Sequence, residues 1–289
     1  MRVAFRLVDV FTDRPFAGNQ LCVVPEPGPL DDATMQSLAR EIGFSETTFV
    51  TETGADRYRM RIFTPDKELP FAGHPTLGTA YVMVAEGRVS TPLIQTVTAG
   101  DVPVEIDLDA GGGRMRQLPP EFGNEFDDRD LVARASGLTA DDLHPDLPMQ
   151  VVSTGLGPLI VPIRDLSTLR RAVRDQRLVA EACERAGGEE LYLFAIERDG
   201  EVTARMFDPN LSIGEDPATG SAAGPLGAYL AARAVAGMPG RVRVQQGAQV
   251  DRPSVLEVEV HENAGQLAVF VGGSVQIVGE GSFVVGERG

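Results

Sequence analysis

The chain contains only two cysteines, and their positions indicate neither a disulfide nor a metal site. Cys22 lies in the apolar run of residues 21–24, and Cys183 lies in a stretch with helical character. Neither has the short spacing of a metal-binding pair, and two cysteines in a cytosolic protein are more often buried thiols than a bridge. The histidines are too far apart in sequence for a metal-ligand pattern. They are His74, His144 and His261. We therefore expect no bound metal.

A single lysine, Lys67, is present in the whole chain. A pyridoxal or other Schiff-base mechanism would depend on this residue alone, and its position near two prolines and beside Glu68 argues against such a role. Glycine patterns for phosphates and dinucleotides are also absent. No Gly-x-x-x-x-Gly-Lys-[Ser/Thr] occurs, and Gly155-x-Gly157 lacks its third glycine. The sequence thus predicts an activity that needs no cofactor.

Long apolar runs and positive net charge are missing as well. No run reaches the roughly 18 apolar residues of a membrane-spanning helix. The formal net charge is −16, which disfavours nucleic acids and anionic membranes as partners because phosphate binding needs clustered cations. Residues 1–10 look like a first strand and lack the uninterrupted apolar core of a signal peptide. We expect a cytoplasmic protein that binds a small molecule and, at 289 residues, is long enough for two domains.

One short motif, [His/Asp]-Pro-x-x-Gly-[Thr/Ser]-Ala, occurs twice. The first copy reads His74-Pro75-Thr76-Leu77-Gly78-Thr79-Ala80, and the second reads Asp216-Pro217-Ala218-Thr219-Gly220-Ser221-Ala222. Each copy follows a strand-like Arg-[Ile/Met]-Phe-x-Pro, at residues 61–65 and 205–209, and runs into an apolar helical stretch. A separation of about half the chain indicates two similar halves rather than an array of small repeats.

The similarity extends to the segments around the motif. Apolar runs that end in Val-Pro lie at residues 18–25 and 155–162. The first is followed by a predicted helix over residues 31–42, with Asp31 or Asp32 as N-cap. The second is followed by a helix from about residue 165 that carries Leu169, Val173 and Ala182. The motif helices are predicted over residues 75–85 and from 217 towards 236, the second kinked or restarted at Pro225.

This order of elements predicts an α+β fold of two pseudo-symmetric domains, each a curled β-sheet wrapped around a central helix. A stretch rich in proline and aspartate, residues 118–148, marks the junction. We expect an N-terminal half over residues 1–118 and a similar C-terminal half over residues 119–267. The strands near residues 268–289 are candidates to complete the N-terminal half or its counterpart. Two such halves with different ionisable groups could together form one site.

His74 and Asp216 each precede a proline that would open a helix, which places both at the N-cap. Aspartate is a common cap, so Asp216 also has a purely structural interpretation, whereas histidine caps poorly and points more to function. Backbone N–H groups and the dipole at a helix start favour a carboxylate or an oxyanion. Gly73 and Gly220 would let the backbone approach a ligand closely, and Ser221 adds a hydroxyl donor.

Glu46 is the candidate general base. It lies between apolar residues where a loop leads into a strand, in Phe44-Ser45-Glu46-Thr47-Thr48-Phe49-Val50. In a partly desolvated cleft the pKa of its carboxyl group would rise towards neutrality, which suits a group that takes and returns a proton. The alternative is an exposed glutamate that begins a strand.

Taken together, these segments resemble the PhzF-like family, named for the phenazine-biosynthesis isomerase. The resemblance runs over nearly the whole chain, and Gln20, where the family usually has proline after Gly-Asn, leaves the candidate residues intact. The segments, in order, are Val8-Asp9-Val10-Phe11-Thr12, Pro15-Phe16-Ala17-Gly18-Asn19, Gly43-Phe44-Ser45-Glu46-Thr47, residues 61–65, residues 68–78, residues 214–225, Gln246-Gly247 and Arg252-Pro253-Ser254.

The resemblance implies the diaminopimelate-epimerase-like fold and a cofactor-free isomerase, often dimeric, with its site between the two domains. It implies that Glu46 moves a proton between carbon atoms of the substrate. His74 and Asp216 would position the substrate and assist the proton movement. Ser221 and Gly73 would hold the substrate carboxylate.

We therefore expect a homodimeric isomerase that shifts a proton on a small carboxylate-bearing, unsaturated or hydroxylated substrate. The phenazine precursor trans-2,3-dihydro-3-hydroxyanthranilate is one candidate. The alternative is a non-catalytic protein that binds small carboxylates on the same fold. A two-thiol racemase is disfavoured, because relatives of this fold place both cysteines in the site, whereas Cys22 and Cys183 lie outside the repeated motifs.

Overall fold

The computed structural model describes residues 1–198, 200–209, 214–263 and 265–286, except for the side chain of Asn263. The chain forms two compact units. Unit 1 consists of Met1–Arg116 and Gly272–Gly289, and unit 2 consists of Gln117–Val271. The chain therefore leaves unit 1, builds the whole of unit 2 and returns to unit 1.

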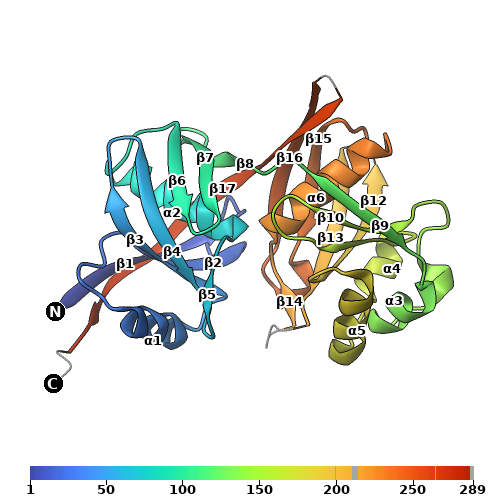
Figure 1. Ribbon diagram of the computed structural model, residues 1–289, viewed down its shortest axis with the longest axis horizontal. Helices are drawn as coiled ribbons and strands as arrows, with labels where there is room; N and C mark the ends of the chain where they lie inside the picture. The colour runs from blue at the N-terminus through green and yellow to red at the C-terminus, as the bar shows by residue number, and fades with distance from the viewer. Residues whose placement is uncertain (199, 210–213, 264, 287–289) are drawn as a thin grey trace. The chain divides into compact units, whose positions relative to one another are not determined.

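The sheet of unit 1 curls around a central helix and closes on itself. Strand β1 pairs with β2 and β17, β2 with β3, β3 with β4, β4 with β5 and β6, β6 with β7, β7 with β8, and β8 with β17. Helix α2 lies within these strands and α1 lies outside them (Figure 1). The elements are β1 Arg2–Val10, β2 Asn19–Val24, α1 Asp32–Ile42, β3 Glu46–Thr53, β4 Arg57–Phe63, β5 Glu68–Leu69, α2 Gly73–Ala85, β6 Leu93–Val97, β7 Gly100–Asp107, β8 Gly112–Arg116 and β17 Gln266–Val284, which belongs to unit 1 from Gly272 onwards.

Unit 2 repeats this order of pairing. Strand β9 pairs with β10, β10 with β11, β11 with β12, β12 with β13, β13 with β14 and β15, and β15 with β16. The parallel pairs β11–β12 and β13–β15 match β2–β3 and β4–β6 of unit 1. The elements are β9 Glu121–Phe126, α3 Arg129–Ala135, β10 Met149–Ser153, β11 Leu159–Pro162, α4 Leu166–Arg170, α5 Gln176–Ala186, β12 Leu191–Arg198, β13 Glu201–Phe207, β14 Glu215–Asp216, α6 Gly220–Ala232, β15 Gly240–Gln246 and β16 Ser254–Asn263; the short 3-10 helices are η1 Ala140–Asp142 and η2 Ala248–Val250.

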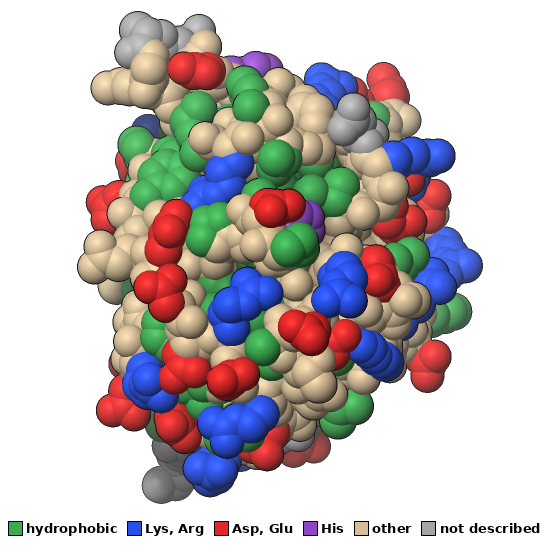
Figure 2. Space-filling view, turned by 90° about the vertical axis from the view of Figure 1, so that its right-hand side faces the viewer, with side chains coloured by type: hydrophobic (Ala, Val, Ile, Leu, Met, Phe, Trp, Pro, Cys, Tyr) green, Lys and Arg blue, Asp and Glu red, His purple; other side chains and the backbone are tan. Residues whose placement is uncertain are grey.

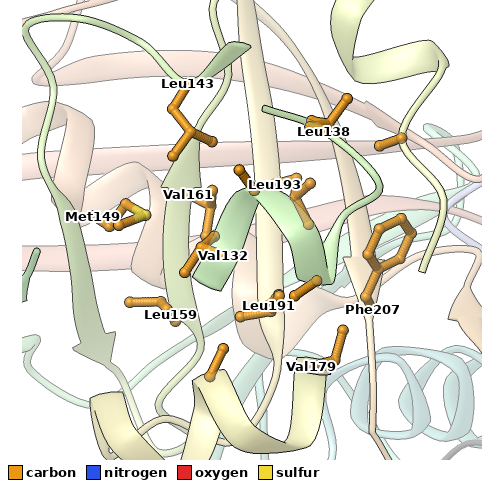
Figure 3. Packing of buried hydrophobic residues seen from close by; sticks show 14 of the residues in the cluster. Val132, Leu138, Leu143, Met149, Leu159, Val161, Val179, Leu191, Leu193 and Phe207 are labelled. Carbon is orange, nitrogen blue, oxygen red and sulfur yellow. The ribbon is translucent and has the colours of Figure 1, made fainter. Parts of the chain in front are cut away.

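Two layers of side chains pack on the sheet of unit 2. The inner face surrounds α6, which is buried along nearly its whole length. The outer face packs against α3, α4 and α5 through an apolar cluster that includes Leu191, Leu193 and Phe207 (Figure 3). Unit 1 has a smaller outer cluster beneath α1, which includes Phe49 and Phe63. This arrangement confirms the predicted α+β class.

The outer helices differ in part from the prediction. Helix α1 has Asp31 as its N-cap, whose carboxylate accepts a hydrogen bond from the backbone N–H of Thr34, as the sequence suggested. The single helix predicted from residue 165 to residue 182 is wrong, because the structure has two helices, α4 and α5. Between them the N–H of Val173 bonds to the carbonyl of Ser136, and Asp175 then caps α5. Helix α6 is a single helix, with Pro225 inside it.

Gly247 allows two segments to meet closely where β15 ends. Its φ is +81°, a conformation that favours glycine. A Cβ atom here would lie 2.3 Å from the carbonyl oxygen of Arg252 and 2.4 Å from that of Pro217. The close approach places the end of β15 directly beside the second copy of the motif.

We expect Gly247→Ala to destabilise the protein by more than about 3 kcal/mol, because backbone clash adds to backbone strain. Gly265→Ala is the matched control, since its φ is +77° and nothing lies within 4 Å of the added Cβ. The control should cost about 1–2 kcal/mol, the strain of the left-handed conformation alone. Urea unfolding measures both, and equal losses would contradict the close approach at Gly247.

Candidate active site

Glu46 and His74 lie in contact in unit 1. Glu46 is the first residue of β3, and His74 is the second residue of α2. The Oε2 atom of Glu46 is 3.2 Å from the Nε2 atom of His74, and the side chains are 15% and 6% exposed. Glu46 is thus a largely buried carboxylate beside an imidazole, and not an exposed residue that begins a strand.

Asn19 fixes the other side of the His74 ring. The Nδ2 atom of Asn19 is 3.2 Å from Nδ1 of His74. The hydroxyl group of Ser45 donates to Oδ1 of Asn19 at 3.4 Å, which orients the amide with its N–H groups towards the ring. Because an amide nitrogen can only donate, Nδ1 accepts, and a neutral His74 carries its proton on Nε2, facing Glu46. The sequence pattern identified His74 and Glu46 but did not assign a role to Asn19 or Ser45.

The start of α2 has no side-chain cap. Its N-cap is Ala72, whose methyl group cannot accept a hydrogen bond, and no acidic residue occurs in the first turn. Gly73 opens the helix without a side chain. The hydroxyl group of Thr76 donates to the carbonyl of Ala72 at 2.9 Å and accepts from Nε2 of Gln95 at 2.9 Å, which holds this turn in place. Such a helix start favours a negative group.

Asp216 belongs to a second polar network, in unit 2. It is the last residue of β14, and its Oδ2 atom accepts a hydrogen bond from the hydroxyl group of Thr219. Gln246, at the end of β15, donates through Nε2 to the carbonyl of Asp216 at 2.8 Å and to the Thr219 hydroxyl at 3.0 Å. Its Oε1 atom accepts from the hydroxyl group of Tyr192 at 2.9 Å and from the backbone N–H of Thr219 at 3.3 Å. Gln246 thus orients Thr219, and Thr219 orients the carboxylate.

Gly220 and Ser221 form the first turn of α6, and both are buried. Thr219 is the N-cap residue, but its side chain bonds to Asp216 instead of capping the helix. The carbonyl of Gly220 accepts a hydrogen bond from Nε2 of Gln117 at 2.8 Å, which fixes the turn from another segment of unit 2. This first turn therefore begins directly after Thr219, the residue whose hydroxyl group bonds to Asp216.

The predicted N-cap positions of His74 and Asp216 are wrong. In unit 1 the helix begins at Gly73, so His74 lies inside the first turn. In unit 2 Asp216 is paired with Met206 as part of β14, and the Thr219 N–H is engaged by Gln246, so the helix begins only at Gly220. The two copies of the motif present their ionisable residues from different elements, a helix in unit 1 and a strand in unit 2.

An arginine–glutamate pair anchors the strand before each helix. In unit 2 the guanidinium of Arg205 forms two bonds with Glu215, of 2.8 and 2.6 Å, and also donates to the carbonyl of Ala172 at 2.7 Å. In unit 1 Arg61 bonds to Glu68 in the same way, at 2.8 and 2.7 Å, but near the surface. Glu215 immediately precedes Asp216, so the buried pair fixes the backbone that carries the candidate carboxylate.

Acidic and basic side chains are interspersed on the face shown in Figure 2. Within the part of the chain that the structure describes, no three His, Cys, Asp or Glu side chains form a group that could hold a metal ion. Among the same residues no helix is long and apolar enough to cross a membrane.

The comparisons with known proteins agree on the fold of this chain and on its family. Two solved structures share the fold at low sequence identity. A probable proline racemase from Agrobacterium radiobacter has a TM-score of 0.66 and 15% identity, and the match covers 98% of this chain and 93% of that one. A hydroxyproline epimerase from Agrobacterium vitis has a TM-score of 0.66 and 13% identity, and the match covers 97% of this chain and 92% of that one. They confirm the predicted racemase- and epimerase-like fold with two similar halves.

The family is shown by closer matches. The family model "Phenazine biosynthesis-like protein" matches residues 8–281, and the chain belongs to this family. A Bacillus anthracis phenazine biosynthesis protein of the PhzF family has a TM-score of 0.90 and 26% identity over 99% of this chain and 100% of that one. Uncharacterized isomerases from Clostridium acetobutylicum and Escherichia coli O157:H7 are 31% and 36% identical, over 96% and 88% of this chain and 97% and 88% of their own. The protein is an isomerase of the PhzF family.

Both cysteines are buried, and burial raises the pKa of each thiol to about 12. A thiol stays protonated below its pKa, so only roughly one molecule in 10⁴ carries a thiolate at pH 8. We expect iodoacetamide at pH 8 to leave Cys22 and Cys183 of the native protein unmodified over an hour. Mass spectrometry measures the reaction, and the same protein unfolded in urea is the control. Rapid alkylation of the native protein would contradict the burial and return a two-thiol mechanism to consideration.

Replacing Gln246 tests the network around Asp216. We expect Gln246→Leu to lower the free energy of unfolding by about 2–4 kcal/mol, because it removes the buried partners of Tyr192 and Thr219. Gln245→Leu is the matched control: its side chain is only half-buried on the other face of β15, and the change should stay within about 0.5 kcal/mol. Urea titration measures both values. A loss no larger than in the control would contradict the network.

Proposed function

We propose that this isomerase moves a proton between carbon atoms of a small carboxylate-bearing substrate by acid–base catalysis at Glu46. The observation that carries the proposal is the buried contact between the Glu46 carboxylate and Nε2 of His74, 3.2 Å apart. A carboxylate held in a desolvated place beside an imidazole is a common arrangement for general acid–base chemistry.

In the proposed reaction Glu46 takes a proton from a substrate carbon. The C–H bond breaks, its electron pair passes into the conjugated system that ends at the substrate carboxylate, and a proton is then delivered to another carbon. Atoms and electrons balance without an oxidant or a reductant. His74, with its proton on Nε2, lies 3.2 Å from Oε2 of Glu46 and would stabilise that group as a carboxylate, while Asn19 holds the other side of the ring.

The helix starts are proposed to bind the negative part of the substrate. Gly73 at the start of α2, and Gly220 with Ser221 at the start of α6, supply backbone donors and a hydroxyl group. We propose that Asp216, held by Thr219 and Gln246, positions a hydroxyl or amino group of the substrate and assists the movement of the proton. The phenazine precursor trans-2,3-dihydro-3-hydroxyanthranilate combines these features, and it is the first candidate substrate.

Solvent exchange in deuterated water tests the proposal. We would incubate the protein with trans-2,3-dihydro-3-hydroxyanthranilate and a panel of cyclic and acyclic unsaturated carboxylates, and follow the products by proton NMR. We expect deuterium to enter one carbon position, and Glu46→Gln to slow this by about 10²–10⁴-fold, the usual contribution of a general base.

Glu41→Gln is the matched control, because Glu41 is an exposed glutamate on α1. It should exchange at the wild-type rate. Full turnover by Glu46→Gln would contradict the role of Glu46. Binding of a panel compound without any exchange would instead favour a non-catalytic carboxylate-binding protein on the same fold.

A further inference from the structure

The contact between Asn19 and His74 constrains the charge of the imidazole ring. The Nδ2 atom of Asn19 can only donate a hydrogen bond, and it lies 3.2 Å from Nδ1 of His74. An imidazolium ring carries a proton on both nitrogen atoms, so its Nδ1 atom could not accept this bond. The contact therefore favours a neutral ring over a charged one.

The fold of unit 1 fixes the position of Asn19. It is the first residue of β2, it pairs with Val10 of β1, and it is 2% exposed. Gly18 precedes it with a φ of +69°, and a Cβ atom there would lie 2.4 Å from the carbonyl oxygen of Val10. The hydroxyl group of Ser45 donates to Oδ1 of Asn19 at 3.4 Å and so orients the amide. Asn19 thus meets the ring from a strand whose backbone is held on both sides.

Asn19 and Glu46 approach the ring from neighbouring parallel strands. Leu21 of β2 faces α2, because a Cβ atom on Gly78 of that helix would lie 2.8 Å from its Cδ2 atom. Asn19 is two residues before Leu21, and Glu46 lies opposite Leu21 in the register of β2 and β3, so these side chains share the inner face of the sheet. The ring of His74 lies between the amide at Nδ1 and the carboxylate at Nε2.

Glu46 is the charged group that faces His74 from the strands around α2. On β1, Asp9 projects to the other side, because the residues before and after it face the helix. On β7 and β8, Glu105 and Arg114 pair with one another at 2.8 Å, and their side chains are 55% and 40% exposed. The Glu46 carboxylate favours an imidazolium, whereas burial of the ring, whose side chain is 6% exposed, and the Asn19 amide both oppose it.

The charge of His74 affects how strong a base Glu46 can be. An imidazolium 3.2 Å away would form an ion pair with the carboxylate, hold it in its charged form and so weaken it as a base. A neutral ring with its proton on Nε2 stabilises the carboxylate only through a dipole. Removal of a proton from carbon needs a strong base, so a neutral His74 suits the proposed reaction better than a charged one.

The two halves of the sequence show the same link between amide and imidazole. The apolar runs that end in Val-Pro align Asn19 with Leu156. The repeated motif aligns His74 with Asp216, which has no ring nitrogen to direct. The half with the histidine therefore has an amide at this position, and the half with the aspartate has a leucine.

We propose that Asn19 is a positioning residue of this isomerase: it keeps His74 neutral, with its proton on the nitrogen beside Glu46, and so preserves Glu46 as a base. This inference rests on the proposed function. A second proton on the ring would have to enter at Nδ1, where the Asn19 amide lies, so His74 does not take up the proton that Glu46 removes. Glu46 keeps that proton until it delivers it to the second carbon or exchanges it with water.

NMR of protein labelled with ¹⁵N-histidine tests this inference without a substrate. The chain has three histidines, and the signals lost in His74→Gln identify those of His74. At pH 7 we expect the wild-type protein to have a neutral His74 with its proton on Nε2. Asn19→Asp should instead give an imidazolium, or a ring with its proton on Nδ1, because a carboxylate at this position accepts that proton.

Asn124→Asp is the matched control, because it makes the same change at an exposed position of β9 and should leave the His74 signals unchanged. The wild-type spectrum decides by itself, even if a variant does not fold. An imidazolium, or a neutral ring with its proton on Nδ1, in the wild-type protein overturns the inference and leaves the proposed function intact. A wild-type His74 spectrum in folded Asn19→Asp also overturns it, since the amide would then not direct the proton.

Kinetics on a panel compound that the wild-type protein turns over measure the effect on Glu46. We expect Asn19→Asp to lower kcat at least about tenfold, with KM changed less than about threefold, because the ring then has the wrong charge or the wrong proton position. Asn19→Leu only frees the ring and should lose less. A purely structural role predicts the reverse order, since aspartate has the shape of asparagine and leucine makes none of its hydrogen bonds.

The two proposals fail in different ways. Wild-type kcat in Asn19→Asp, while Glu46→Gln is inactive, overturns the role of Asn19 alone. Full turnover by Glu46→Gln instead removes the function on which this inference rests.

Discussion

The need to bury a helix that is apolar on almost every side governs both units. Helices α2 and α6 expose very little surface, and only a sheet that curls around them can cover them completely. Each buried aliphatic side chain contributes about 1.5–3 kcal/mol, which favours this arrangement strongly. The first turn of such a helix still has backbone N–H groups without partners inside the helix. The candidate residues of each unit lie at or beside such a helix start.

The two units solve this problem with the same kinds of residue at different positions. Each has a buried tyrosine and glutamine joined through their side chains, Tyr58 with Gln95 and Tyr192 with Gln246, and each glutamine bonds to a threonine near the helix start. The difference lies in the segment that leads to the helix. In unit 1 the chain continues for several residues between β5 and His74, whereas in unit 2 Asp216 is itself part of β14. A shared frame thus carries an imidazole in one unit and a carboxylate in the other.

The parts that could be predicted from sequence are those determined by local pattern. Apolar periodicity predicted both motif helices and the Arg-x-Phe strands before them. Burial of one face of a strand, or of a whole helix, requires apolar residues at closely spaced positions in the sequence, so the pattern can be seen without the structure. The N-caps of the motif helices could not be predicted in this way. The start of α6 depends on Gln246 and on the pairing of β14, which are contacts between residues distant in the sequence. The meeting of Asn19 with His74 is of the same kind, since each residue alone has no distinctive pattern.

Strand β17 passes from unit 2 into unit 1, and this gives the chain a fixed order of completion. Unit 2 is a continuous stretch, so all of its residues are available once Val271 has been synthesised. The first 116 residues are made earlier, but the strand that pairs with β1 and β8 is not yet present. During translation, strands β1 and β8 of unit 1 therefore stay without this pairing partner until the residues of β17 have been synthesised. The half that carries Glu46 and His74 is the first to be synthesised and the last to be closed.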